Sequence, residues 1–292
     1  MSGYTFHYID PDGISWTLTD QIHSFLKRGG MKGFGVMRVE AAAARHPYRD
    51  GVSRLGGPYT PEREMQLALE ISHNSGVEWD ALNRRLARNV SAYKDPAALG
   101  HLLILRPDGE RRYIDCWMVE WPDPAMEGPL FGTVMPVFWA ARPWFYDPAL
   151  SVQTLALPGG GLVFPITFPI TFVTTTLDGY VYPDNEGDVE TWPLIRIDGP
   201  GTDPIIDNVT TGLSTALTQT LDAGDYILID MDAATITFFD LSLGTTTSII
   251  ELMGAASTFW SLVRGPNTIR VRMGDAVSGS ISFTFQVLYQ SL

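Results

Sequence analysis

Residues 185–208 read NEGDVETWPLIRIDGPGTDPIIDN, and this stretch sets the pattern of the C-terminal half of the chain. Short runs of apolar and β-branched residues alternate with Gly, Pro, Asp and Asn, the residues that end strands and form turns. The same alternation continues in LDAGDYILID at residues 221–230 and in STFWSLVRGPNTIRV at residues 257–271. Short strands separated by such turns predict a β-sandwich or jelly roll.

Outward from this stretch, residues 151–292 are expected to be almost wholly β. The predicted strands are residues 152–157, 167–176, 194–197, 219–221, 226–230, 235–240, 268–273 and 280–288. The aromatic, proline-closed segment RPWFYDP at residues 142–148 comes before them and looks like the end of a domain. We therefore predict two domains, residues 1–150 and residues 151–292.

The first 150 residues are expected to form an α+β domain. Alternating patterns predict strands at residues 4–9, 15–18, 34–44, 64–72, 101–106, 111–121 and 130–141. Trp79, Leu82, Leu86 and Val90 recur at helical spacing and predict one helix, which ends near Tyr93. The glycine-dense residues 27–35 are expected to be irregular, and the polar residues 46–58 to form a long exposed loop. The fold class is thus mainly β with a minor α component.

The acidic charge of the chain is concentrated in its second half. Of the net charge of −13, residues 1–150 carry 16 Lys and Arg against 18 Asp and Glu, and residues 151–292 carry 4 against 15. Such an acidic half repels phosphates, so recognition of nucleic acid sequence is not expected. The carboxylates are interpreted as solvated turn residues; calcium binding is the alternative, although EF-hand spacing is missing. The sequence contains no run of 18 apolar residues, so a membrane span is not expected. The N-terminus lacks the apolar core of a signal peptide.

The sequence offers no catalytic or cofactor-binding signature. All five histidines lie in the first domain, none at metal-ligand spacing, so a Ser-His-Asp arrangement cannot form within residues 151–292. No phosphate-binding glycine loop is found either. The single cysteine, Cys116, excludes an intramolecular disulfide and lies in a predicted strand, where it suits a small buried side chain. We predict that the chain is not an enzyme, with no catalytic residues, no cofactor and no metal.

Aromatic residues of the second domain leave carbohydrate binding open as an alternative. β-Sandwiches can bind sugars on a face that carries Trp or Tyr, because these rings stack on pyranose rings. The candidate stacking residues are Trp192, Tyr180 and Tyr182. For Trp192, a core or inter-sheet position is the favoured interpretation.

Six short motifs follow one another in the second half. They are N-x-G-D at 185–188, P-x-I-x-I-x-G-P at 193–200, N-x-T-T-G at 208–212, L-x-A-G-D-Y at 221–226, S-x-F-W-x-L at 257–262 and G-x-N-x-I at 265–269. In this order they resemble the C-terminal domain of phage distal tail proteins, the siphovirus-type tail component family. A looser similarity covers the first half, through Gly57-Pro58, RRYID at residues 111–115 and the RPWFYD exit at residues 142–147.

The resemblance implies a structural virion protein at the tip of a phage tail, made in the host cytoplasm. It implies an N-terminal domain that forms a hexameric ring and a C-terminal sandwich of galectin or carbohydrate-module type. The implied partners are tail tube, tape-measure and tail hub proteins, together with tail fibres or receptor-binding proteins that dock on the ring. A sandwich that binds sugars on the host envelope is the alternative function.

Ring contacts are expected in the first domain. Closed rings need heterologous interfaces, which edge strands and long loops often supply. The candidates are the arginine-rich loop near residues 45–54 and the hairpin at residues 101–121. The candidate contact residues are Arg45, Arg49, Arg54, Arg111 and Arg112.

Overall fold

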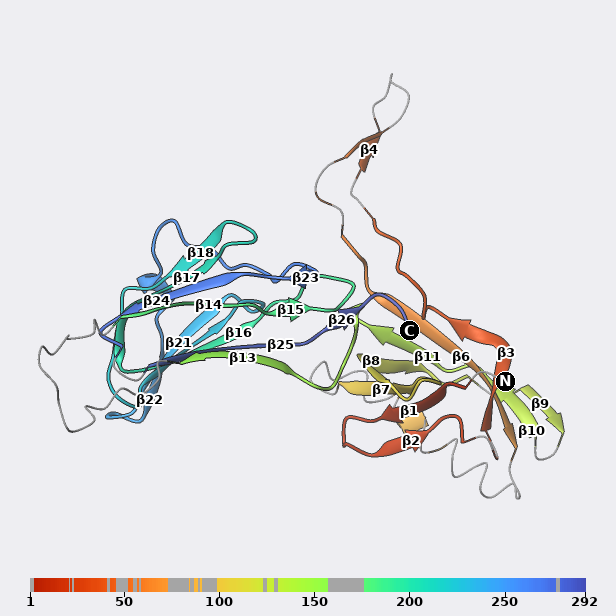
Figure 1. Ribbon diagram of the computed structural model, residues 1–292. Coiled ribbons are helices and arrows are strands. Elements are labelled where there is room, and N and C mark those ends of the chain that lie inside the picture. The colour runs from red at the N-terminus through yellow and green to blue at the C-terminus, as the bar shows by residue number, and fades with distance from the viewer. Residues whose placement is uncertain are drawn as a thin grey trace, which may run out of the picture. The chain divides into compact units, whose positions relative to one another are not determined.

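A computed structural model describes most of the chain (Figure 1). The described residues are 3–20, 22, 24–40, 43–45, 52–54, 57, 59–72, 84, 87–88, 90, 99–122, 125–128, 131–156, 176–276 and 279–292. The chain forms two compact units, of which unit 1 consists of Met1–Pro148 with Tyr289–Leu292 and unit 2 of Ala149–Leu288. Nearly all described secondary structure is antiparallel β, so the prediction of a mainly β chain is confirmed.

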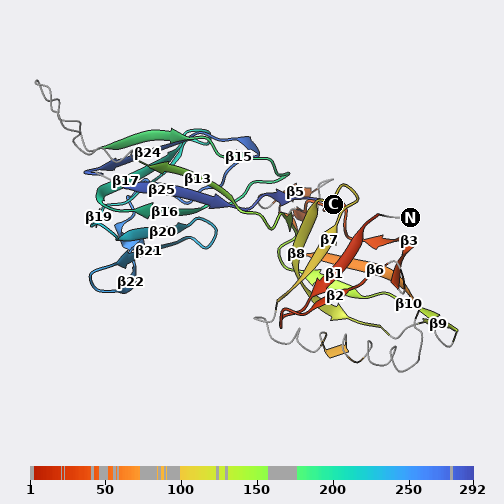
Figure 2. The same cartoon turned by 60° about the horizontal axis from the view of Figure 1, so that its bottom comes forward.

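Unit 1 is built around one large antiparallel sheet. Its strand order is β2-β1-β7-β8-β11-β6-β10-β9, with β3 paired to β6 and with β12 joining β8 to β26. The bounds are β1 Thr5–Ile9, β2 Ser15–Thr17, β3 Ser24–Lys32, β6 Arg63–Ser72, β7 Gly100–Leu105, β8 Arg111–Glu120, β9 Ala125–Gly128, β10 Phe131–Val134, β11 Val137–Ala140, β12 Phe145–Tyr146 and β26 Leu288–Tyr289. The hairpin β7–β8 and the pairing of β1 with β2 agree with the predicted strands (Figure 2).

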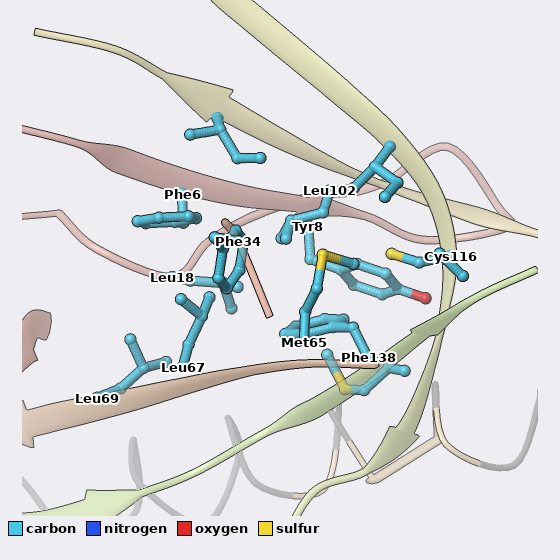
Figure 3. Packing of buried hydrophobic residues seen from close by; sticks show 14 of the residues in the cluster. Phe6, Tyr8, Leu18, Phe34, Met65, Leu67, Leu69, Leu102, Cys116 and Phe138 are labelled. Atoms are coloured by element: carbon cyan, nitrogen blue, oxygen red, sulfur yellow. The ribbon is translucent and has the colours of Figure 1, made fainter. Parts of the chain in front are cut away.

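The core of unit 1 follows from strict alternation along these strands. Strand β8 buries every second side chain, and β6 buries all five of its inward ones together with Ala68, as expected when one sheet face packs inward. The fully buried rings of Phe6, Tyr8 and Phe138 meet Met65 and Leu102 in this core (Figure 3). Cys116 is fully buried among them, which raises the pKa of its thiol, so its predicted role as a small core residue is confirmed.

Three sequence interpretations in unit 1 are wrong. The predicted strand at residues 34–44 is one of them, because residues 34–39 are not in a strand and, among the described residues of this run, only Ala43 and Ala44 belong to a strand, β4. Residues 27–35 are not irregular throughout, because Ser24–Lys32 form β3, whose register against β6 shifts between Leu26 and Met31. The glycines permit this shift: Gly29 has a φ of +72°, and a Cβ on Gly30 would lie 2.8 Å from the Ala68 Cβ. The predicted run 130–141 is two strands, β10 and β11, which are separated at residues 135–136 and both pair with β6.

The predicted helix lies mostly outside the described residues. Those that are described within it, Arg84, Ala87, Arg88 and Val90, are helical. Arg84 and Arg88 are exposed, and Val90 packs against the core of unit 1. This is the arrangement that the helical spacing predicts.

A ribbon of two strands, which we call the arm, projects from unit 1 (Figure 1). It consists of β4 Ala43–Arg45, β5 Val52–Arg54 and the described residues 35–40 and 59–62 that lead to and from them. Ala43 pairs with Arg54, and closer to the body Glu40 pairs with Tyr59 through two backbone hydrogen bonds of 2.8 Å. Of the segment at residues 46–58, predicted as a long loop, only β5 and Gly57 belong to the described residues.

Arg63, the first residue of β6, joins the segments at the root of the arm. It is fully buried and donates to the carbonyl oxygens of Gly33, Gly35 (3.0 Å), Pro143 (2.7 Å) and Gln290 (2.8 Å). Its guanidinium also lies 4.7 Å from the ring centre of Phe145. Burial lowers the pKa of Arg63 to about 10, so it stays charged at neutral pH.

Unit 2 consists of two main antiparallel sheets that lie one over the other (Figure 1). One has the order β13-β25-β16-β20-β21-β22, with bounds β13 Ser151–Ala156, β25 Ser280–Phe285, β16 Leu194–Asp198, β20 Tyr226–Asp230, β21 Thr235–Asp240 and β22 Thr245–Ser248. The other has the order β14-β24-β17-β18, with β19 on β17, and bounds β14 Leu177–Val181, β24 Ile269–Gly274, β17 Gly201–Asn208, β18 Leu213–Ala216 and β19 Thr220–Leu221. Short additional elements are β15 Asp184–Asn185, β23 Gly265–Pro266 and the 3-10 turn η1 Ile250–Leu252.

Most predicted strands of unit 2 are present, while β14, β17, β18 and β22 were not predicted. The predicted strand 167–176 lies outside the described residues except for Thr176, which is not in a strand. Close packing between the sheets is visible at Gly179 of β14, where a Cβ would lie 2.9 Å from a methyl group of Leu155 on β13. The finer jelly-roll or galectin-like connectivity stays a prediction.

The turn residues of the quoted stretch hold the loops of unit 2 in place. Buried Asn185 donates to the carbonyl of Val189 (2.8 Å) and accepts from the backbone N–H of Gly187 (3.2 Å). Buried Asn208 and Asn267 bridge neighbouring backbone segments in the same way. Side-chain amides that replace backbone partners in turns explain why these positions are Asn.

We predict that Arg63→Met destabilises unit 1 by about 3 kcal/mol or more, because four backbone carbonyls lose the donor that the fully buried guanidinium supplies. Arg63→Lys should be intermediate, since an ammonium group cannot reproduce the planar fork. Urea unfolding measures the change, and hydrogen exchange of peptides from β6 assigns the transition to unit 1.

The matched control is Arg28→Met, at an exposed arginine of β3, which should cost less than about 0.5 kcal/mol. Equal stability of the Arg63→Met and Arg28→Met variants would contradict the role given to Arg63.

Candidate assembly surface

The arm exposes apolar side chains on an isolated two-stranded ribbon. Val36 is 70% exposed, Val39 59% and Tyr59 53%. A ribbon of two strands is at best marginally stable alone, and stability requires packing against a further surface. The exposed apolar residues and the ribbon geometry together mark the arm as a contact surface.

The five predicted contact arginines fall into four groups, of which Arg112 forms one by itself. Arg45 and Arg54 lie in β4 and β5 of the arm, where Arg45 pairs with Val52. Arg49 lies outside the described residues. Arg111 is exposed at the start of β8, opposite Leu105 of β7.

Arg112 is engaged inside unit 1. Its side chain is buried, bonds Glu110 at 2.7 Å, lies 3.9 Å from Asp147 and stacks 3.7 Å from the ring centre of Tyr289. These contacts connect β8 to the segment that leaves unit 1 and to the one that returns. We therefore leave Arg112 out of the surface available to a neighbour.

Sequence reasoning missed Arg63 and the apolar residues of the arm. A signal for Arg63 was present, because it occupies the inward register of REMQLALEIS, which Met65 and Leu67 share. The signal for Val36, Val39 and Tyr59 was weaker: apolar residues flank a polar, turn-rich segment. Neither pattern identifies a partner by itself.

A hydrogen-bonded trio lies on the outer face of β7, β8 and β12. Asp115 accepts from Tyr146 (2.5 Å) and bonds the His101 ring at 2.7 Å. This bond raises the pKa of His101. Burial acts to raise the pKa of Asp115, but the bonds from His101 and Tyr146 outweigh it, and the pKa is lowered. The trio resembles a catalytic arrangement only in composition, because Tyr146 is its only potential nucleophile. Burial and the bond to Asp115 raise the pKa of this phenol, so it stays protonated.

The candidate sugar-stacking residues divide between the two sheets of unit 2. Tyr180 in β14 and Tyr182 just after it lie 6.4 Å apart with ring planes 15° apart. Trp192 is 41% exposed and comes just before β16, a strand of the other sheet. The core or inter-sheet position favoured for Trp192 is therefore wrong, because much of its surface is accessible.

The acidic residues of unit 2 include several that build turns. Buried Asp225 accepts from the backbone N–H groups of Leu241 (2.9 Å) and Asp222 (3.0 Å). Asp230 and Asp240 accept similar bonds in the hairpins that follow β20 and β21. Within the part of the chain that the structure describes, no three His, Cys, Asp or Glu residues form a potential metal site. No helix there is long and apolar enough to cross a membrane.

Comparison with known families adds the decisive observation for unit 2. Residues 186–288 match the model described as the siphovirus-type tail component, C-terminal domain. Residues 186–288 are therefore similar to the C-terminal domain of siphovirus-type tail components. The predicted resemblance to phage distal tail proteins is thereby confirmed. The match covers all six motifs except the first residue, Asn185.

One solved structure extends the similarity to the fold of the whole chain. The crystal structure of the Dit protein of phage SPP1 aligns with a TM-score of 0.63 at 17% identity, over 97% of this chain and 98% of that one. It is described as a paradigm of the hub adsorption apparatus of phages that infect Gram-positive bacteria. A baseplate structure of phage P2 in its activated conformation with calcium aligns with a TM-score of 0.48 at 11% identity, over 96% and 97% of the two chains. No curated protein sequence matches the chain.

We predict a pH dependence of unit 1 stability that depends on His101. Because its pKa in the fold is raised above the ordinary 6.5, protonated His101 stabilises the fold below that pH. The contribution is lost as pH rises through the folded value. Since the pair is partly exposed, the loss should be less than about 1 kcal/mol. Urea unfolding at several pH values between about 5.5 and 8.5 measures it.

His101→Asn keeps a hydrogen-bond donor but does not titrate, so the difference between wild type and variant isolates this group. His7 is present in both proteins, so its contribution cancels in this difference. Burial lowers the pKa of His7, and its effect on stability therefore has the opposite sign. A wild-type minus variant difference that stays constant with pH would refute the prediction.

Proposed function

We propose that this protein is a structural subunit of a phage tail tip, without catalytic activity, in which unit 1 assembles into a hexameric ring. The ring joins the tail tube to the hub and offers docking sites for fibres or receptor-binding proteins. Unit 2, the tail component domain, supplies an outer docking module. The family of residues 186–288 supports the tail assignment.

The arm is the single observation that carries the ring proposal. Its ribbon exposes Val36, Val39 and Tyr59, and the described residues of its outer part, β4 and β5, pair only with each other. Such a ribbon gains stability when it lies on another surface. In a ring, each subunit can place its arm on the next, which is the head-to-tail contact that closes a cycle.

Charge and edge strands support the same arrangement. Residues 1–150 are nearly balanced in charge, with 16 Lys and Arg against 18 Asp and Glu, so long-range repulsion between copies of unit 1 is small. Arg88 and Arg111 are exposed and can pair with carboxylates of a neighbour. Strand β2 forms one edge of the large sheet and offers unpaired backbone groups.

The partners proposed for this ring follow from its place in a tail. The tail tube and tape-measure proteins would meet one face, and the hub the other. Fibres or receptor-binding proteins would attach around the circumference. Synthesis in the host cytoplasm and assembly into the virion complete the proposal.

We predict that the purified full-length chain forms particles of six times its 32.2 kDa mass at micromolar concentration. The double variant Val36→Glu/Val39→Glu should remain monomeric, because two carboxylates would be buried without partners at the contact. Mass photometry measures both states directly.

Val209→Glu is the matched control, since Val209 is 53% exposed but lies in unit 2. It should form the same oligomer as wild type. A monomeric wild type under these conditions and in purified virions would disprove the ring. If the double variant still forms hexamers, the arm is not part of the interface.

A further inference from the structure

We propose that the outer face of the β14–β24–β17–β18 sheet binds a neutral oligosaccharide, stacked on Tyr180 and Tyr182. This goes beyond the proposed assembly role, because ring formation involves unit 1 and does not require a ligand on unit 2.

The aromatic part of this face is a pair of exposed, nearly parallel rings. Tyr180 is 47% exposed and Tyr182 66%, and the angle between their planes is 15°. Asp178, Tyr180 and Tyr182 alternate with Leu177 and Val181, which are buried, so all three point away from the core. A flat ligand that stacks on one ring is therefore parallel to the other. Pyranose rings stack on aromatic rings through their C–H faces.

A ladder of charged side chains continues this face across three more strands. In register, Tyr180 lies opposite Arg270, Arg270 opposite Asp207, and Asp207 opposite Ser214. Arg270 donates two bonds to Asp178, of 3.0 and 2.8 Å, and Arg272 donates to Asp207 at 2.6 Å. Ser214 donates to Asp207 at 2.7 Å. The pairing of Arg270 with Asp178 is bidentate, which fixes these two groups before any ligand arrives.

The pairing also determines which class of sugar suits the face. Each arginine is balanced by a carboxylate, so the face itself is neutral and offers both donors and acceptors to hydroxyl groups. Residues 151–292 carry 4 Lys and Arg against 15 Asp and Glu, which repels polyanionic glycans at longer range. A neutral oligosaccharide satisfies both conditions.

The other main sheet has a similar set of residues, but its tyrosine is covered more closely than Tyr180, whose ring centre lies 5.9 Å from the guanidinium of Arg270. The guanidinium of Arg196 lies 4.0 Å from the centre of the Tyr226 ring, and Phe239 stacks at 4.9 Å. These neighbours occupy the Tyr226 surface that a sugar would need. Trp192 lies at the start of that sheet, away in sequence from the Tyr180–Tyr182 pair, and has no part in the proposed site.

Saturation-transfer NMR on the full-length chain tests the proposal. The probes are hexasaccharides of four neutral types: maltohexaose, laminarihexaose, cellohexaose and chitohexaose. We expect transfer to ring protons of at least one, and at least a tenfold weaker affinity in Tyr180→Ala/Tyr182→Ala. The double variant Tyr180→Phe/Tyr182→Phe keeps the stacking faces and should retain binding.

Trp192→Ala is the control on the other sheet and should bind as wild type. Mass photometry of the same samples shows whether assembly is unchanged, so failure of this site and failure of the ring are distinguishable. No transfer to any of the four probes would overturn the proposal. So would binding that survives loss of both tyrosines or that disappears in Trp192→Ala.

Discussion

A buried guanidinium is the constraint on which unit 1 depends. Arg63 brings together carbonyls from residues 33–35, residue 143 and residue 290, which are far apart in the sequence. These residues are the root of the arm, the segment before the exit to unit 2 and the segment after the return. A buried cation satisfied by carbonyls tolerates little displacement, because each lost bond leaves a buried polar group unpaired. The arm, the exit and the return are thus held at one point inside unit 1.

Unit 2 uses a different principle, in which side chains of loop residues hold the strand ends. Asn185, Asn208 and Asn267 are buried and bind backbone groups, and Asp225 does the same for the loop after β21. With the loops fixed in this way, the outward positions of the strands are free to carry other residues. The ladder of Arg270, Asp207 and Ser214 occupies such positions. The family motifs and the proposed ligand face therefore belong to separate residues.

Alternation of apolar and polar residues predicted most strands, because one face of each sheet is buried. It failed where special backbone geometry intervenes. Strand β3 contains glycines that permit a register shift, and β17 contains Pro204 at the irregularity between Thr202 and Ile205, where its missing N–H is tolerated. The role of Arg63 was not predictable, since its carbonyl partners come from three distant segments. Tyr180 and Tyr182 were recognised as candidates, but their pairing depends on β14, a strand that the pattern did not predict.

In the proposed assembly, the arm of each subunit rests on a neighbouring subunit while unit 2 remains available for docking. Electron cryo-microscopy of the purified full-length protein tests this most directly. The account predicts closed six-membered rings in which each arm, with Val36, Val39 and Tyr59, lies against the unit 1 of the next subunit. Isolated subunits, or rings whose arms extend into solvent without contact, would contradict it.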